Sequence, residues 1–160
     1  MKPAQTLNHD EIAARIPHQG SMCLLDRVEA WDENRIVCRA VSHRDANNSH
    51  RDAANPLRAA DRLGAANGIE YAAQAMAVHA ALLTTGGERP KAGYLTSVRS
   101  VNLHVARLDD IAAELEIVAE RQSGDAASVL YSFTISTAGQ LLLDGRVTAV
   151  LDAESYGRRE

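Results

Sequence analysis

The chain has 160 residues, a length that predicts one domain spanning residues 1–160. Its 17 basic and 21 acidic residues give a formal net charge of −4, which argues against binding of nucleic acid, because duplex DNA is held by lysines and arginines that neutralise phosphates. Hydrophobic residues make up 46% of the chain, too many for a disordered protein. We see no apolar run long enough for a membrane span and no secretory signal, so we expect a cytoplasmic protein.

The N-terminal part predicts a short helix followed by a β-hairpin. Asn8 and Glu11 have the spacing of a capping box, and Pro17 should end a helix over residues 9–16. The runs 22–31 and 35–42 are β-rich and are separated by the turn-forming residues 32–34. Residues 43–63 are polar and irregular, and a connection of that length in a compact domain is often functional.

Two cysteines, Cys23 and Cys38, lie in the two arms of this hairpin. In the expected pairing Cys38 faces Val28 and Cys23 lies near His43, which is too far out of register for a disulfide. We therefore expect both thiols to be reduced.

The rest of the chain predicts one long helix and four strands. Residues 64–84 are rich in good helix formers, end before a Gly-Gly pair and are apolar nearly all round, which favours a helix buried on most sides. The runs 92–106, 112–121, 127–137 and 141–151 are β-rich with short turns between them, which predicts a four-stranded antiparallel meander.

This order of elements is typical of an α+β hotdog fold, in which a curved antiparallel sheet wraps around one long central helix. A single helix too apolar for solvent needs such a cover. Because exposed sheet edges promote aggregation, and pairing two edges across a twofold axis would cover them, we expect a dimer.

Glu70 stands out because it interrupts the apolar helix about two turns from its predicted start. A buried carboxylate needs a partner, whereas a helix N-terminus favours the ionised form. These opposed influences predict a pKa near neutrality, which suits general acid–base catalysis. Gln74, one turn further on, is placed to orient Glu70. The alternatives are a glutamate on an exposed helix face and a glutamine that is only a buried polar anchor.

The segment around Glu70 resembles the FabZ/FabA-type 3-hydroxyacyl-carrier-protein dehydratases. In LGAANGIEYAAQAMA, Glu70 and Gln74 fit the family pattern PG-x4-E-x3-Q, while Gly64 and Ala65 occupy the Pro-Gly positions. The upstream segment RIPHQGSMCLLDRV is similar to the family's LPHRYPFLLVDRV, without a gap. Together with the NPLR segment at 55–58 and the GYLTSVR strand, these motifs look most like the ApeP-like dehydratases of aryl polyene biosynthesis. Those enzymes work on thioesters held by an acyl carrier protein.

The chain departs from the FabZ pattern at the catalytic histidine. That family places it in a GHFP motif fourteen residues before the glutamate, and this position is Pro56 here. Elimination of water needs both a base and an acid, so another histidine has to serve. We favour His18, inside the matched upstream motif, over His50 in the long loop. The alternative for His18 is a histidine that only anchors backbone carbonyls. The other histidines are expected to be a capped core residue (His79) and surface, loop or sheet residues (His9, His43 and His104).

Backbone N–H groups at the start of the helix, around Gly64 and Ala65, are candidates for binding the thioester carbonyl. The alternative for Gly64 is an ordinary glycine near a helix start. No histidine has metal-ligand spacing, so we predict no metal, and no cofactor beyond the phosphopantetheine arm that carries the substrate. Five basic side chains are candidates for contacting an acidic carrier protein or that arm, or else form a solvated set: Arg58, Arg62, Arg89, Lys91 and Arg99.

These observations predict a 3-hydroxyacyl-[acyl-carrier-protein] dehydratase with Glu70 and His18 as its catalytic residues, working with an acyl carrier protein as a homodimer or as a heterodimer with another hotdog subunit. Three alternatives remain open. The chain is an acyl-thioester hydrolase of the same fold, a non-catalytic partner subunit, or an acyl-thioester-binding module without chemistry.

Overall fold

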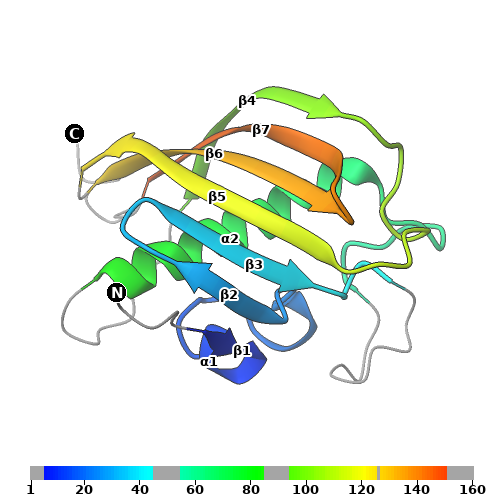
Figure 1. Cartoon of the computed structure of the whole chain (residues 1–160), viewed down its shortest axis with the longest axis horizontal. Helices are drawn as coiled ribbons and strands as arrows, with labels where there is room; N and C mark the ends of the chain where they lie inside the picture. Colours follow the sequence, from blue (N-terminus) through cyan, green and yellow to red (C-terminus); the bar gives the residue numbers. More distant parts are fainter. Residues whose placement is uncertain (1–5, 45–54, 85–93, 126, 151–160) are drawn as a thin grey trace, which may run out of the picture.

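The protein is built from one curved antiparallel sheet and one long helix. The computed structural model describes residues 6–44, 55–84, 94–125 and 127–150. The elements are β1 (Leu7–Asn8), α1 (His9–Ala13), the 3-10 turn η1 (Gly20–Met22), β2 (Arg27–Trp31), β3 (Arg35–Ala40), the 3-10 turn η2 (Ala65–Asn67), α2 (Gly68–Leu83), β4 (Tyr94–Leu103), β5 (Leu115–Gly124), β6 (Ser128–Thr137) and β7 (Gln140–Val150). Helix α2 crosses one face of the sheet (Figure 1). This arrangement confirms the predicted hotdog fold.

The seven strands follow the order β1-β2-β3-β5-β6-β7-β4. The predicted meander is therefore wrong in one respect, because β4 pairs with β7 rather than with β5. Strand β5 has no free edge for β4, since β3 and β6 occupy both of its sides. The alternation of apolar and polar residues along a strand shows which side chains share a face, but it does not show with which strand it pairs.

The N-terminal segment forms much as its sequence predicts. Asn8 and Glu11 make the expected capping box, although α1 ends at Ala13 and the chain continues as turns up to Pro17. In the hairpin Val28 pairs with Cys38, as expected. Strand β2 begins only at Arg27, so Cys23 lies outside it; both cysteines are buried, and neither forms a disulfide.

The core lies between α2 and the inner face of the sheet. Tyr71, Ala72 and Ala75 on α2 are fully buried against apolar strand residues. Gly68 lets the first turn approach β6 and β7 closely, because a Cβ there would lie 2.8 Å from the Leu143 methyl groups. This close packing fixes the N-terminal end of α2 on the sheet.

Candidate active site

Helix α2 begins later than predicted, and this changes the setting of Glu70. Residues 65–67 form a 3-10 turn, Asn67 is the N-cap, and Glu70 lies in the first turn of α2 instead of two turns in. The helix N-terminus favours a negative charge at that position. The side chain of Glu70 is 29% exposed, so it is neither buried in the core nor free in solvent.

His18 meets Glu70 directly. Its Nε2 lies 3.1 Å from Glu70 Oε1, and its side chain is 25% exposed. The residue is held between the turns that follow α1 and the 3-10 turn at Gly20–Met22. Its second ring nitrogen, Nδ1, is buried and has no hydrogen-bond partner among the described residues. The structure thus brings together, within one subunit, the two groups that sequence reasoning paired.

Gln74 links the same carboxylate to the segment that follows His18. Its Nε2 donates to the Met22 carbonyl at 2.7 Å and to Glu70 Oε1 at 3.2 Å. Its Oε1 accepts the Leu24 N–H at 2.9 Å. The side chain is fully buried, so its amide has a fixed position beneath Glu70. Sequence reasoning missed the Met22 and Leu24 backbone groups, because a backbone contact leaves no signal in residue type.

The surroundings of Glu70 lower its pKa. Burial raises the pKa, but the hydrogen bonds from His18 and Gln74 and the charge of His18 lower it by more, so the pKa falls below the ordinary value of 4.5. The prediction of a pKa near neutrality is therefore wrong. Desolvation is incomplete in the first helical turn, and two donors stabilise the carboxylate.

Gly64 and Ala65 lie just before α2, but their N–H groups differ. The Ala65 N–H donates to the Ala106 carbonyl at 3.1 Å, so it is not free to bind a substrate carbonyl in this conformation. The Gly64 N–H has no hydrogen-bond partner among the described residues. Of the two proposed donors, Gly64 is the one that is available.

The other histidines lie apart from this pair. His79 is a buried core residue bonded to the Tyr131 hydroxyl and the Asp32 carbonyl, as predicted. His43 is buried too, against the Ile111 and Ala113 carbonyls, whereas His104 is exposed beside Asp144. His9 contacts the Leu25 carbonyl, and His50 lies outside the described residues.

The candidate carrier-contacting arginines are only partly described. Arg58 and Arg62 lie in the segment that leads into α2, and Arg99 lies on β4. Arg62 and Arg99 are exposed, and Arg58 donates to the Asp61 carbonyl. Arg89 and Lys91 fall outside the described residues.

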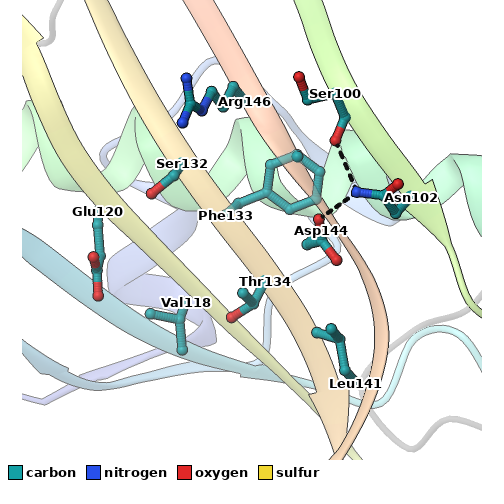
Figure 2. Close-up of a pocket in the computed structure, with 11 residues that line it drawn as sticks. Ser100, Asn102, Val118, Glu120, Ser132, Phe133, Thr134, Leu141, Asp144 and Arg146 are labelled. Carbon is teal, nitrogen blue, oxygen red and sulfur yellow. Dashed lines mark hydrogen bonds between the residues drawn. The ribbon is translucent and has the colours of Figure 1, made fainter.

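A pocket of about 430 Å³ lies on the outer face of the sheet, with α2 behind the strands (Figure 2). Its lining includes Ser100, Asn102, Phe133, Asp144 and Arg146. Neither Glu70 nor His18 lines it, so we do not assign it to the acid–base chemistry.

The described residues contain no group of three or more His, Cys, Asp or Glu side chains arranged to hold a metal ion. None of the helices in these ranges is long and apolar enough to cross a membrane.

The curved sheet around one helix, with an imidazole–carboxylate pair at the start of that helix, places the chain among hotdog-fold proteins. The chain belongs to the ApeP-like family, because the family model for the ApeP dehydratase matches residues 10–156. A search of curated proteins finds no significant match.

Solved structures agree with the fold. The dehydratase heterocomplex ApeI:P from Xenorhabdus doucetiae superposes with a TM-score of 0.78 at 21% identity, covering 90% of this chain and 92% of that one. A thioesterase from Haemophilus influenzae gives a TM-score of 0.60 at 12% identity, with 94% of each chain covered. A mutant thioesterase from Pseudomonas aeruginosa gives 0.52 at 14% identity, with 78% of each chain covered. At such identities these similarities speak for the fold alone.

Proposed function

We propose that this chain removes water from a 3-hydroxyacyl thioester carried on an acyl carrier protein and releases a 2-enoyl thioester. The observation that carries the proposal is the 3.1 Å contact between His18 Nε2 and Glu70 Oε1. It supplies a proton donor and a proton acceptor side by side, and elimination of water needs both. Membership of a dehydratase family supports the same reaction.

The pair can run the reaction without a net change of charge. Because the pKa of Glu70 lies below its ordinary value, the carboxylate is ionised near neutral pH, and we assign it as the base that takes the proton from the α-carbon. Electrons of that C–H bond form the C=C bond, the β C–O bond breaks, and His18 gives a proton to the leaving hydroxyl, which departs as water. The proton on Glu70 then returns to His18 through their contact, so no cofactor is required.

The backbone of Gly64 is suited to binding the thioester carbonyl of the substrate. Loss of the α-proton places negative charge on the thioester oxygen, and a free backbone N–H stabilises such charge. The Gly64 N–H is unoccupied among the described residues, and the turn that follows it leads directly to Glu70. We assign it as a carbonyl donor.

A second hotdog subunit is expected at β4. This strand ends the sheet, and three of its apolar side chains are exposed: Leu95, Val98 and Leu103. They pair with Ala149, Val147 and Leu143, which are buried on the inner face, so these three point to the core side of the sheet beyond its single helix. A second copy or another hotdog chain would cover them, and the similar ApeI:P structure is itself a heterocomplex.

Product analysis tests the reaction. The purified chain is incubated with a 3-hydroxyacyl-carrier protein, and the acyl carrier is then analysed by mass spectrometry. Loss of one water from the bound acyl group supports the proposal. Release of a free acid indicates instead a hydrolase, which is the activity named for two of the similar structures. No change alone, but dehydration after a second hotdog subunit is added, indicates the partner-subunit role.

A further inference from the structure

A chain of buried hydrogen bonds runs from the segment before α2 to the loop beneath the candidate active site. Asn55 Nδ2 lies 3.0 Å from the Tyr71 hydroxyl, which lies 2.7 Å from Ser42 Oγ. Ser42 Oγ in turn donates to the Leu24 carbonyl at 2.8 Å. Asn55, Tyr71 and Ser42 are 6%, 0% and 1% exposed. Buried polar side chains cost free energy unless they are bonded in this way.

Donor counting fixes the direction of this chain. The single Ser42 proton goes to the Leu24 carbonyl, which can only accept, so the Tyr71 hydroxyl donates to Ser42. The Tyr71 oxygen therefore accepts from Asn55. The Asn55 amide has one orientation, because its Oδ1 accepts the Leu57 N–H at 2.9 Å. Hydrogen bonds that point the same way polarise and strengthen one another.

The Leu24 peptide connects this chain to the catalytic carboxylate. Its carbonyl is held by Ser42, and its N–H is held by Gln74 Oε1. With Oε1 committed to Leu24, the amide nitrogen of Gln74 must face Glu70. A flipped amide would set an oxygen against the carboxylate and repel it. Leu24, together with the Met22 carbonyl that also accepts from the Gln74 amide nitrogen, thus fixes the orientation in which Glu70 receives a donor.

We propose that Asn55, Tyr71 and Ser42 are positioning residues, which hold Leu24 so that Gln74 presents its N–H groups to the Glu70 carboxylate. The inference deepens the proposed function and rests on it for the catalytic readout, while the state of Glu70 is measured independently. Among the described residues His18 is the charged or titratable side chain that contacts Glu70. A change in this chain of hydrogen bonds should therefore alter the surroundings of Glu70 by shifting Gln74.

A tyrosine on β6 offers a matched control. Tyr131 is also a buried tyrosine, and its hydroxyl binds His79 near the other end of α2. Tyr71→Phe and Tyr131→Phe each remove one buried hydroxyl and keep the ring. Neither hydroxyl touches Glu70, so a purely structural role predicts similar effects of the two changes at similar loss of stability.

The experiment compares both variants by three measurements: unfolding in urea, kcat and KM for the 3-hydroxyacyl-carrier protein, and the titration of Glu70 by carbon NMR of its carboxyl group. For Tyr71→Phe we expect kcat to fall about tenfold with little change in KM, because small misplacement of a catalytic group is costly. We also expect the Glu70 pKa to rise, because its donor is loosened. Tyr131→Phe should leave kcat and the Glu70 pKa close to those of the wild type.

The result that overturns the inference is a Glu70 titration in Tyr71→Phe that coincides with that of Tyr131→Phe. Should Tyr71→Phe not fold, Ser42→Ala and Asn55→Ala are measured against Tyr131→Phe by the same criterion. If the wild type does not dehydrate the substrate, the proposed function fails, but the NMR titration still decides for or against the positioning role.

Discussion

The imidazole of His18 and the carboxylate of Glu70 lie 3.1 Å apart within one subunit, one carried by the turns after α1 and the other by the first turn of α2. Gln74 fastens the two segments to each other, since it binds Met22 and Leu24 on one side and Glu70 on the other. The contact between His18 and Glu70 therefore depends on how these two distant segments are held together.

Glu70→Gln should abolish most of the dehydratase activity. The substitution keeps the shape of the side chain but removes the proton acceptor, and the loss of one general acid–base group lowers rates by about 10²–10⁴-fold. The measurement is kcat for the 3-hydroxyacyl-carrier protein. Glu29→Gln is the control, because it removes an exposed carboxylate that pairs with Arg39 away from Glu70. Full activity of Glu70→Gln contradicts the assignment.

His18→Gln should lower kcat by a similar factor, because the glutamine amide nitrogen can donate to Glu70 from near the position of His18 Nε2 but cannot carry the proton to the leaving hydroxyl. Glutamine keeps the contact with Glu70 more nearly than alanine does, so the fold is expected to persist. The test is kcat together with the circular dichroism spectrum. A native spectrum with wild-type kcat would show that the acid comes from another residue.

The contribution of Glu70 to the stability of the protein should be lost in acid. Because its folded pKa lies below the ordinary 4.5, the ionised form stabilises the fold above that pH, and this contribution is lost as the pH falls through the lowered value. The wild type should thus exceed Glu70→Gln in stability at neutral pH by more than it does in acid. Urea unfolding of both proteins across a pH series measures the difference. A gap that stays constant from neutral pH into acid would argue against a stabilised carboxylate.

Gln74→Ala should be costly for both stability and activity. It removes the hydrogen bonds that Gln74 makes to the Leu24 N–H and the Met22 carbonyl, at about 1–3 kcal/mol for each buried polar group left unsatisfied. It also removes a donor from Glu70, so the Glu70 pKa should rise. Urea unfolding and carbon NMR give the two readouts. An unchanged Glu70 titration would mean that Gln74 is only a structural anchor.

Gly68→Ala should destabilise the start of α2. The added methyl would lie 2.8 Å from the Leu143 methyl groups, and overpacking of this kind costs about 1–3 kcal/mol, more than the helix propensity gained. Gly64→Ala is the steric control, because its Cβ would meet only Asn67 Nδ2, at 3.7 Å. Urea unfolding compares the two. Equal stability of both variants would show that the first turn has room to shift.

Val98→Lys should weaken association through the β4 edge. We expect the wild-type chain to self-associate, and burying an unpaired ammonium should lower the association constant about tenfold or more. Sedimentation at several concentrations measures this, with Thr134→Lys on the exposed face of β6 as the control. A monomeric wild type would contradict self-association through β4, and equal association of both variants would show that the copies meet elsewhere.

The sequence by itself determined most of the elements and singled out Glu70 and His18 as candidates, which the structure places in contact. The capping box at Asn8, the apolar helix with Glu70 and Gln74 one turn apart, and the Val28–Cys38 pairing all follow from local spacing, because capping and alternation depend on neighbouring residues. The choice of His18 followed from a motif match.

Only the tertiary structure decided how these residues work together. It moved Glu70 into the first helical turn, lowered its pKa through His18 and Gln74, occupied the Ala65 N–H with Ala106 and placed β4 beside β7. Each of these depends on contacts between segments far apart in the chain. Burial, charge and backbone partners depend on which segments lie close together in space, so these outcomes could not be predicted from the residue types alone.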